Sequence, residues 1–236
     1  MEFKLIRDNW DRQSIIEFDK YLSSIGNKES VPFEEKIVLS KHKIHGISAK
    51  ILRQFAKEII KGNFISFLNN MSGISYEFLI ICGYVISLIR DFDLQIKYLN
   101  EYLKFASCWA ETDIIKVKTK NNEEKLFNIA KNYISSGETF ARRMGLVLLF
   151  GYVNNIIFVN RIFDILDSLL NEKEYYVNMA GAWLLAELFI KQRDITLNYF
   201  NDSKTNSFII NKAIQKCRDS YRVSATDKEL LLSFKV

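Results

Sequence analysis

The sequence predicts an all-α protein, and three observations point that way. The chain has 236 residues, 48% of them apolar and 26% charged, which is enough to bury a sizeable core. One proline and nine glycines leave little material for the closely spaced tight turns of a sandwich or barrel. Apolar residues recur instead at helical spacing along most of the chain.

The first two helices are marked by their ends as well as by their apolar residues. The segment 9–25 has helical periodicity, and Gly26 is suited to close it. Pro32 fits the first turn of a second helix, which is expected to run to about residue 41. The apolar residues of the first helix are Trp10, Ile15, Phe18 and Leu22.

The remaining helices follow at short intervals without a linker, so one domain is expected over residues 1–236. Ser48 is expected to cap the third helix, and Gly62 lies just beyond its end. The apolar residues of this helix are Ile51, Phe55 and Ile59. The other helices are expected over 63–69, 75–90, 94–106, 111–117, 123–134, 139–152, 156–170, 175–191, 194–200, 207–221 and 226–234.

A faint internal repeat indicates how the helices are arranged. The segment that starts at Arg143 aligns with the one that starts at Asn178, and Asn211 and Trp109 continue the series in either direction at similar offsets. A period of about 35 to 45 residues with two helices per unit is typical of HEAT or TPR repeats, and the TPR signature is missing. We therefore expect an α-solenoid of HEAT-like helical repeats, curved, with these four residues on a concave binding wall.

Basic residues gather in two stretches, which favours an anionic partner. Residues 36–61 carry seven cations against Glu58 alone, a local charge of +6 that exceeds the +5 of the whole chain. Such clusters suit the phosphates of duplex DNA, although an ordinary solvated helix surface is the alternative. The cations expected to contact DNA are Lys50, Arg53, Lys57 and Lys61 on one helix face, and Lys212, Lys216 and Arg222 near the C-terminus.

Several kinds of chemistry find no support in the sequence. Three widely spaced cysteines provide neither a disulfide scaffold nor a CxxC pair. His42 and His45 have no third ligand nearby, so neither a metal nor another cofactor is expected. No apolar run is long enough to span a bilayer, and the N-terminus has no secretory pattern. We expect a cytoplasmic monomer that does not bind membranes.

Four residues would form a candidate catalytic site if their side chains meet across adjacent repeats. Trp109 and Asp113 stand at i, i+4 and share a helix face, and Arg143 and Trp183 belong to the following repeats. Indole faces attract cations, a carboxylate stabilises positive charge on a departing sugar, and arginine holds phosphate. The alternative is that both tryptophans are core anchors and Asp113 is a surface residue.

The motifs around these residues resemble one known family. Trp-x-x-x-Asp at 109–113, aromatic-x-Arg-Arg at 140–143 and Ala-x-x-Trp-Leu-Leu at 180–185 resemble the HEAT-like-repeat DNA alkylation repair glycosylases of the AlkD type. The segments 45–47 and 211–224 are also similar to that family. The resemblance implies excision of cationic N3- or N7-alkylated purines, with Asp113 as the catalytic carboxylate. It also implies that Trp109 and Trp183 contact the lesion nucleotide and that Arg143 contacts the DNA backbone.

The chain departs from the family pattern in two places. Ala186-Glu187 stand where the pattern has an arginine ahead of an acidic residue, and Asn178 stands where a basic residue is expected. The alternative function is therefore a catalytically inactive relative that acts as a DNA-structure-binding or protein-interaction solenoid. Either Arg142 or Arg143 is expected to face the DNA, and the register of the motif favours Arg143.

Overall fold

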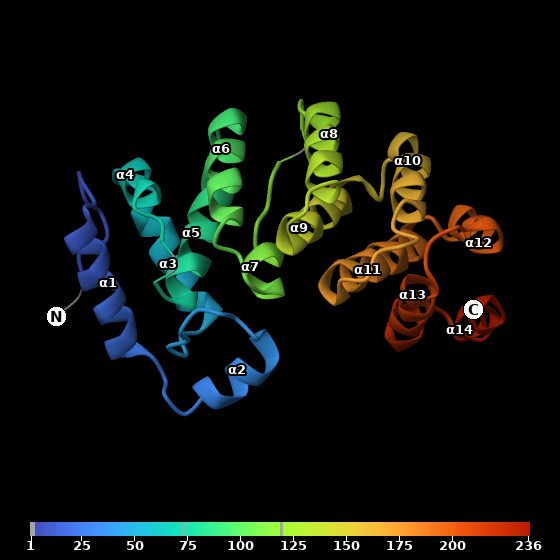
Figure 1. Cartoon of the computed structure of the whole chain (residues 1–236), viewed down its shortest axis with the longest axis horizontal. Helices are drawn as coiled ribbons and strands as arrows, with labels where there is room; N and C mark the ends of the chain where they lie inside the picture. The colour runs from blue at the N-terminus through green and yellow to red at the C-terminus, as the bar shows by residue number, and fades with distance from the viewer. Residues whose placement is uncertain (1–2, 73, 119) are drawn as a thin grey trace. The chain divides into compact units, whose positions relative to one another are not determined.

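A computed structural model describes residues 3–72, 74–118 and 120–236, and within these residues the all-α prediction is confirmed. The described chain contains fourteen α-helices and two short 3-10 helices (Figure 1). Its only β-type pairing is an isolated bridge between Lys43 and Ser75. Contacts between Cα atoms divide the chain into two compact units, Met1–Lys118 and Thr119–Val236.

The helices fall at the places that the sequence predicts, with small shifts at their ends. The first unit contains α1 (Arg12–Ile25), α2 (Val31–Val38), α3 (Ala49–Ile59), α4 (Phe64–Asn69), α5 (Tyr76–Leu88), α6 (Phe92–Leu103) and α7 (Trp109–Asp113). The second contains α8 (Glu123–Ile134), α9 (Thr139–Leu149), η1 (Phe150–Tyr152), α10 (Ile156–Asp167), α11 (Tyr175–Lys191), α12 (Arg193–Asp202), α13 (Ser207–Asp219), α14 (Ala225–Leu230) and η2 (Leu231–Phe234).

Two helix starts differ from the sequence prediction for identifiable reasons. Helix α1 begins at Arg12 because the Asp11 side chain accepts a hydrogen bond from the backbone N–H of Ser14, and the Ser14 hydroxyl interacts with Asp11 in return. Helix α7 begins at Trp109 and ends at Asp113, so the predicted segment 111–117 is wrong at both ends. It starts early because Cys108 has extended backbone and Glu111 caps the turn.

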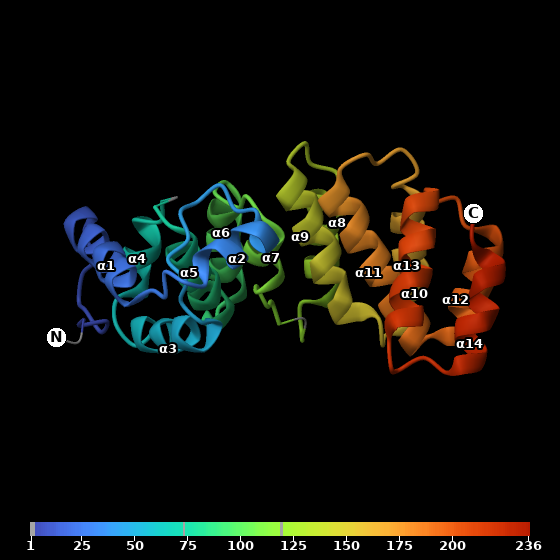
Figure 2. The same cartoon turned by 90° about the horizontal axis from the view of Figure 1, so that it is seen from below.

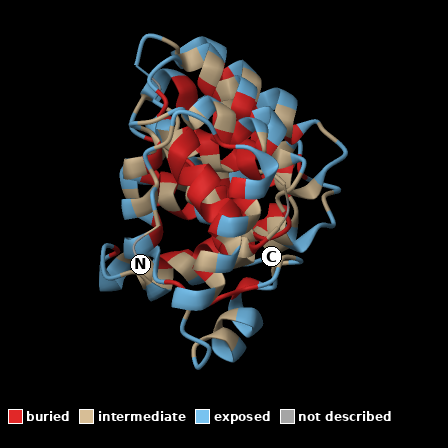
Figure 3. Cartoon of the chain, turned by 90° about the vertical axis from the view of Figure 1, so that its left-hand side faces the viewer, coloured by how far each residue is buried: buried red, intermediate tan, exposed pale blue. Residues whose placement is uncertain are grey.

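Helix α5 is the centre of the first unit. It packs against α1, α3, α6 and α7, and its residues from Glu77 to Ile86 are all buried. Helix α3 turns Leu52, Ala56 and Ile59 inward, whereas Ile51 is 42% exposed. The predicted apolar face of α3 was therefore wrong at Ile51, because the buried stripe starts one residue later. Figure 3 shows buried and exposed positions on the same helices, as expected for amphipathic elements.

In the second unit, three helices form one layer. Helices α9, α11 and α13 pack side by side (Figures 1 and 2), and α8, α10 and α12 pack against members of this layer. The starts of the three helices lie together, because the Phe140 and Tyr176 rings are 5.5 Å apart and the Tyr175 and Phe208 rings 6.1 Å apart. Gly145 permits the close approach of α8 and α9, since a Cβ there would lie 2.6 Å from the Ala130 carbonyl oxygen.

Candidate functional site

The short helix α7 carries two candidate catalytic residues, and the buried side chain of Glu111 fixes its first turn. The Glu111 carboxylate accepts a hydrogen bond from the backbone N–H of Cys108 at 3.2 Å and from the Ser40 hydroxyl at 2.9 Å. Glu111 is fully buried. A five-residue helix is too short to be stable by itself, so these contacts are what hold Trp109 and Asp113 in place.

Asp113 lines a hollow of about 340 Å³ in the first unit, together with three cations and an aromatic ring. Arg53 and Lys57 come from α3, Tyr84 from α5, and Lys116 from the segment after α7. The guanidinium carbon of Arg53 lies 5.2 Å from the centre of the Tyr84 ring, within the range of a cation–π contact. The first unit thus brings the predicted catalytic carboxylate together with two of the predicted DNA-binding cations.

Trp109 lies one helical turn before Asp113 and is anchored at both ends of its side chain. Its indole N–H donates to the Ile37 carbonyl at the end of α2, with 3.1 Å between nitrogen and oxygen. The ring packs on a buried apolar cluster that includes Val38 and Ile44 and retains partial exposure. The Thr112 hydroxyl lies 2.9 Å from the Trp109 carbonyl oxygen and 3.1 Å from Asp113 Oδ1. Trp109 is therefore anchored and still partly exposed.

The basic face of α3 is exposed, as its helical spacing predicts. Lys50, Arg53 and Lys57 are all exposed on this helix. Lys61 lies beyond the helix end and pairs with Glu58 at 2.7 Å, so part of its charge is already compensated. The face therefore presents three cations and one ion pair to solvent.

The loop that leads into α3 is held by a second buried carboxylate. Glu77 of α5 accepts hydrogen bonds from the backbone N–H groups of His45 at 2.9 Å, Gly46 at 2.7 Å and Ile47 at 3.4 Å. Burial raises the pKa of Glu77, while these N–H groups oppose the rise. Gly46 has φ of +83°, a conformation that favours glycine. The Gly-Ile segment singled out in the sequence therefore sets where α3 and its cations begin.

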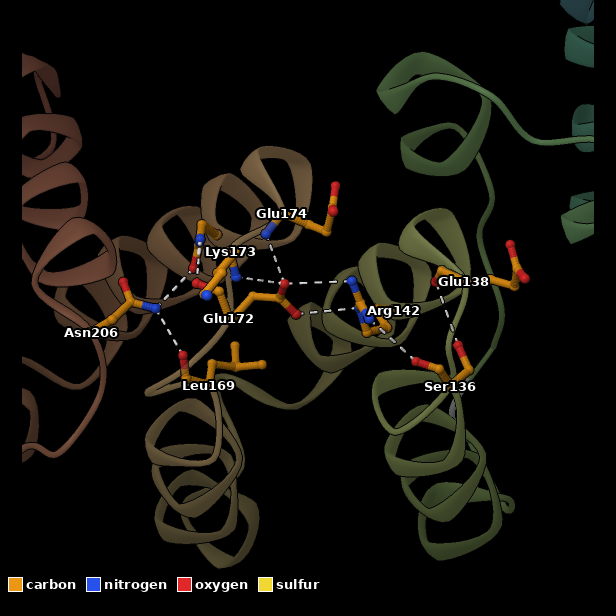
Figure 4. A network of polar contacts seen from close by, with 9 residues as sticks. Ser136, Glu138, Arg142, Leu169, Glu172, Lys173, Glu174 and Asn206 are labelled. Carbon is orange, nitrogen blue, oxygen red and sulfur yellow. Dashed lines mark hydrogen bonds and ion pairs between the residues drawn. The ribbon is translucent and has the colours of Figure 1, made fainter.

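In the second unit, both candidate arginines of α9 have partners. Arg143 is 5% exposed, and its Nη1 donates to the Tyr176 carbonyl at 2.7 Å. Arg142 pairs with Glu172, with 3.2 Å between Nε and Oε2 (Figure 4). Asn178 is also buried, and it donates to the Glu172 carbonyl at 3.0 Å. These contacts join the starts of α9 and α11.

The remaining candidates of the second unit fall into two groups. Lys216 lies near Arg143 and Lys212, and burial together with these positive charges lowers the pKa of its ammonium group. Arg222 instead forms a bidentate ion pair with Glu187, at 2.9 and 2.8 Å. The second unit therefore gathers three of the predicted cations on neighbouring helices and uses a fourth to fasten the turn after α13 to α11.

Trp183 of α11 is 38% exposed. Its ring centre lies 4.3 Å from that of Phe150 in η1. An indole that packs on one neighbour and keeps more than a third of its surface open is neither a full core anchor nor a mobile surface residue. The structure thus excludes the purely buried alternative for this tryptophan.

Comparison with known families decides the assignment. A family model described as DNA alkylation repair enzyme matches residues 18–217, from within α1 to within α13. The chain belongs to the DNA alkylation repair enzyme family. No individual curated protein matches the chain, so the family model carries the assignment. The matched range includes Asp113, Trp109, Arg143 and Trp183, and of the candidate DNA-binding cations it leaves out only Arg222.

Within the described residues of this member of the DNA alkylation repair enzyme family, no group of three or more His, Cys, Asp or Glu side chains is placed to hold a metal ion. Cys108 and Cys217 are buried, and burial raises the pKa of each thiol to about 12, which disfavours the nucleophilic thiolate. Among the described helices, none is both long and apolar enough to cross a bilayer.

The sequence of this DNA alkylation repair family member did not point to two residues that line the Asp113 hollow, Tyr84 and Lys116, or to Glu111 in the helix that carries Asp113. Tyr84 lies within the most apolar helix, so the sequence predicts it to be a core residue. Lys116 follows α7 and belongs to no recognisable motif. From the sequence, Glu111 is expected to be a surface residue of a helix, whereas the structure buries it. The spacing of Glu111 three positions after Cys108 matches a capping box, but the sequence pattern of that motif has Ser or Thr at the cap, so the sequence offered no clear signal.

Proposed function

We propose that this protein is a DNA glycosylase that removes cationic N3- or N7-alkylated purines from duplex DNA, the first step of base excision repair. The observation that carries the proposal is the carboxylate of Asp113 in a hollow lined by Arg53, Lys57 and Tyr84. Membership of the DNA alkylation repair enzyme family supports the class of substrate. No cofactor is needed for this reaction.

The reaction needs charge stabilisation more than acid catalysis. Alkylation at N3 or N7 makes the purine a cation, so the base leaves as a neutral molecule when its bond to C1′ breaks and takes the bonding electrons. The positive charge then moves to the sugar, which becomes an oxocarbenium-like cation. A carboxylate beside C1′ stabilises that charge. Water adds to C1′ and releases a proton, which completes the hydrolysis. Asp113 supplies the carboxylate.

The cations around the hollow provide the affinity for the DNA backbone. Arg53, Lys57 and Lys116 are suited to phosphates on either side of the damaged nucleotide, with Lys50 and Lys61 extending the contact along α3. Phosphate contacts position DNA without reading its sequence, which fits an enzyme that meets lesions in any context. The Tyr84 ring offers an apolar surface with affinity for cations, here already used by Arg53.

The second unit is assigned a supporting role in the same proposal. Arg143 and Lys212 each lie close enough to Lys216 to interact with it electrostatically, and such a concentration of positive charge suits a phosphate backbone. Trp109 and Trp183, each partly exposed, are proposed on the family resemblance to contact the lesion nucleotide. The layer of α9, α11 and α13 supports the interpretation that the helices form HEAT-like repeats of an α-solenoid whose concave wall binds duplex DNA.

The experiment that tests the proposal is release of 7-methylguanine or 3-methyladenine from a methylated duplex at low salt and excess enzyme. Asp113→Asn is expected to abolish release, and Asp8→Asn, which alters an exposed carboxylate of the same unit, is expected to leave it unchanged. Absence of release by the unaltered protein would reject glycosylase activity, and equal loss in both variants would reject the role of Asp113.

A catalytically inactive DNA-binding relative is the second candidate, and one observation favours it. The position where the family pattern expects a basic residue holds Asn178, which is buried and bonded to Glu172 and Asn206. The second unit therefore offers one cation fewer for phosphate than the family pattern implies. Salt-sensitive duplex binding without base release would establish this candidate. Absence of any duplex binding at low salt would leave a protein-interaction solenoid.

A further inference from the structure

The second unit contains a hollow of about 610 Å³ between α13, α14 and the segment that ends at Val236. Its volume lies within the range of small-ligand pockets, roughly 300–1,000 Å³. Four cations and two carboxylates line it, so its formal charge is +2. The charged residues are Lys212, Arg218, Lys228, Lys235, Asp219 and Glu229.

The cations of this hollow lack acidic partners among the described residues. The ion pairs of this part of the chain join Arg193 to Asp194 and Asp227, and Arg222 to Glu187, and none includes a lining residue. The Nε atom of Arg218 is buried and has no hydrogen-bond partner. This Nε atom is enclosed and out of reach of a ligand, so the anion-binding groups of the hollow are the terminal guanidinium of Arg218 and the lysine ammonium groups that line it. Like charges gathered in one hollow repel one another, and a bound anion relieves that repulsion.

The walls of the hollow are built before any ligand arrives. Leu231 of η2 is fully buried, and the Phe234 ring lies 5.6 Å from that of Phe200 in α12. The Asn211 side chain donates to the Val236 carbonyl and accepts from its N–H at 3.3 Å, which fixes the last residues beside α13. Preformed walls reduce the entropy lost on binding.

We propose that this hollow binds a phosphate group. Arginine matches the tetrahedral oxyanion with a planar pair of donors, and lysines add charge around it. The phosphate has two possible sources, a backbone phosphodiester of duplex DNA or the phosphate of a small ligand. The first source rests on the proposed function, whereas the second does not. Both sources require the same residues, chiefly Arg218 and Lys228.

The test uses the full chain with Arg218→Gln and Lys228→Gln combined. The control combines Lys173→Gln and Lys191→Gln, which remove two exposed charges of the same unit outside the hollow. Thermal unfolding identifies any variant that fails to fold. If Arg218→Gln prevents folding, Lys228→Gln is combined with Lys235→Gln instead, because Lys228 and Lys235 both line the hollow.

Two arms distinguish the sources. In the duplex arm, loss of two phosphate contacts lowers the slope of log affinity against log salt by roughly 1.8, and the control lowers it less. In the second arm, pyrophosphate gives saturable chemical-shift changes at the hollow, and the double variant weakens this binding at least about tenfold. Either result supports phosphate binding and names its source. The proposal is overturned if the double variant and the control have the same salt slope for duplex binding and pyrophosphate does not bind the unaltered protein saturably. The pyrophosphate arm remains decisive if the protein binds no duplex.

Discussion

Replacing Glu77 by alanine tests whether the buried carboxylate holds the loop that leads into α3. The change removes the acceptor of three backbone N–H groups, those of His45, Gly46 and Ile47. Hydrogen bonds to a charged group contribute about 1.5–3 kcal/mol each, but loss of the buried charge also removes its desolvation cost. Because the two effects oppose each other, we expect the free energy of unfolding to fall by about 3–5 kcal/mol, within the range for three buried N–H groups left without an acceptor at about 1–3 kcal/mol each.

Urea unfolding of the Glu77 variants at neutral pH is the assay, with Glu77→Gln as the matched control. The glutamine keeps one acceptor oxygen near Gly46, so its loss should be clearly smaller than that of alanine. Burial raises the pKa of Glu77 in the folded state, so the protonated form favours folding. The stability advantage of Glu77 over glutamine should therefore decline as pH rises from about 4 through the folded-state pKa. A loss below about 1 kcal/mol in the alanine variant would refute this role.

Three further results are expected. Gly46→Ala should destabilise the first unit in urea unfolding, because the backbone φ is +83° and the added Cβ would clash with the Asn27 carbonyl oxygen; wild-type stability would contradict this loop conformation. Arg53→Gln should weaken binding to all duplex sequences alike and lower the slope of log affinity against log salt by about 0.9. Lys20→Gln, an exposed control on α1, should leave this slope unchanged. Equal effects of the two variants would place the α3 face away from DNA. Arg193 lowers the pKa of Asp227, so their ion pair stabilises the fold above the ordinary aspartate pKa, and this stabilisation is lost as pH falls. Arg193→Gln should therefore flatten the dependence of the free energy of unfolding on pH in this range. An unchanged dependence between pH 5 and 2 would contradict this role.

The fold was largely predictable because its signals are local. Apolar spacing, Pro32 and Gly26 depend on neighbouring residues in the chain, and the helices stand where these signals put them. Errors arose where tertiary contacts decide. Helix α7 starts at Trp109 because Glu111 is buried against Ser40, a residue far away in sequence.

The candidate site was predictable only in part. Asp113 and Arg53 were identified from a motif and from charge spacing, yet nothing in the sequence joined them in one hollow with Tyr84. The charge pattern likewise predicts Arg222 as a DNA contact but gives no sign of the ion pair that it forms with Glu187. Charge spacing locates cations on a helix, but the partner that a cation meets depends on packing between helices that are distant in sequence.

The most direct test of the central claim is the single-turnover rate of base release from a methylated duplex saturated with enzyme, for the unaltered protein and Asp113→Asn. Asparagine keeps the shape of the side chain and removes its charge. We expect the rate to fall by at least about 10²-fold while duplex affinity changes less than about threefold, because the carboxylate acts on the transition state and the cations bind the phosphates. Release by Asp113→Asn at the unaltered rate, or no release by the unaltered protein, would contradict the account.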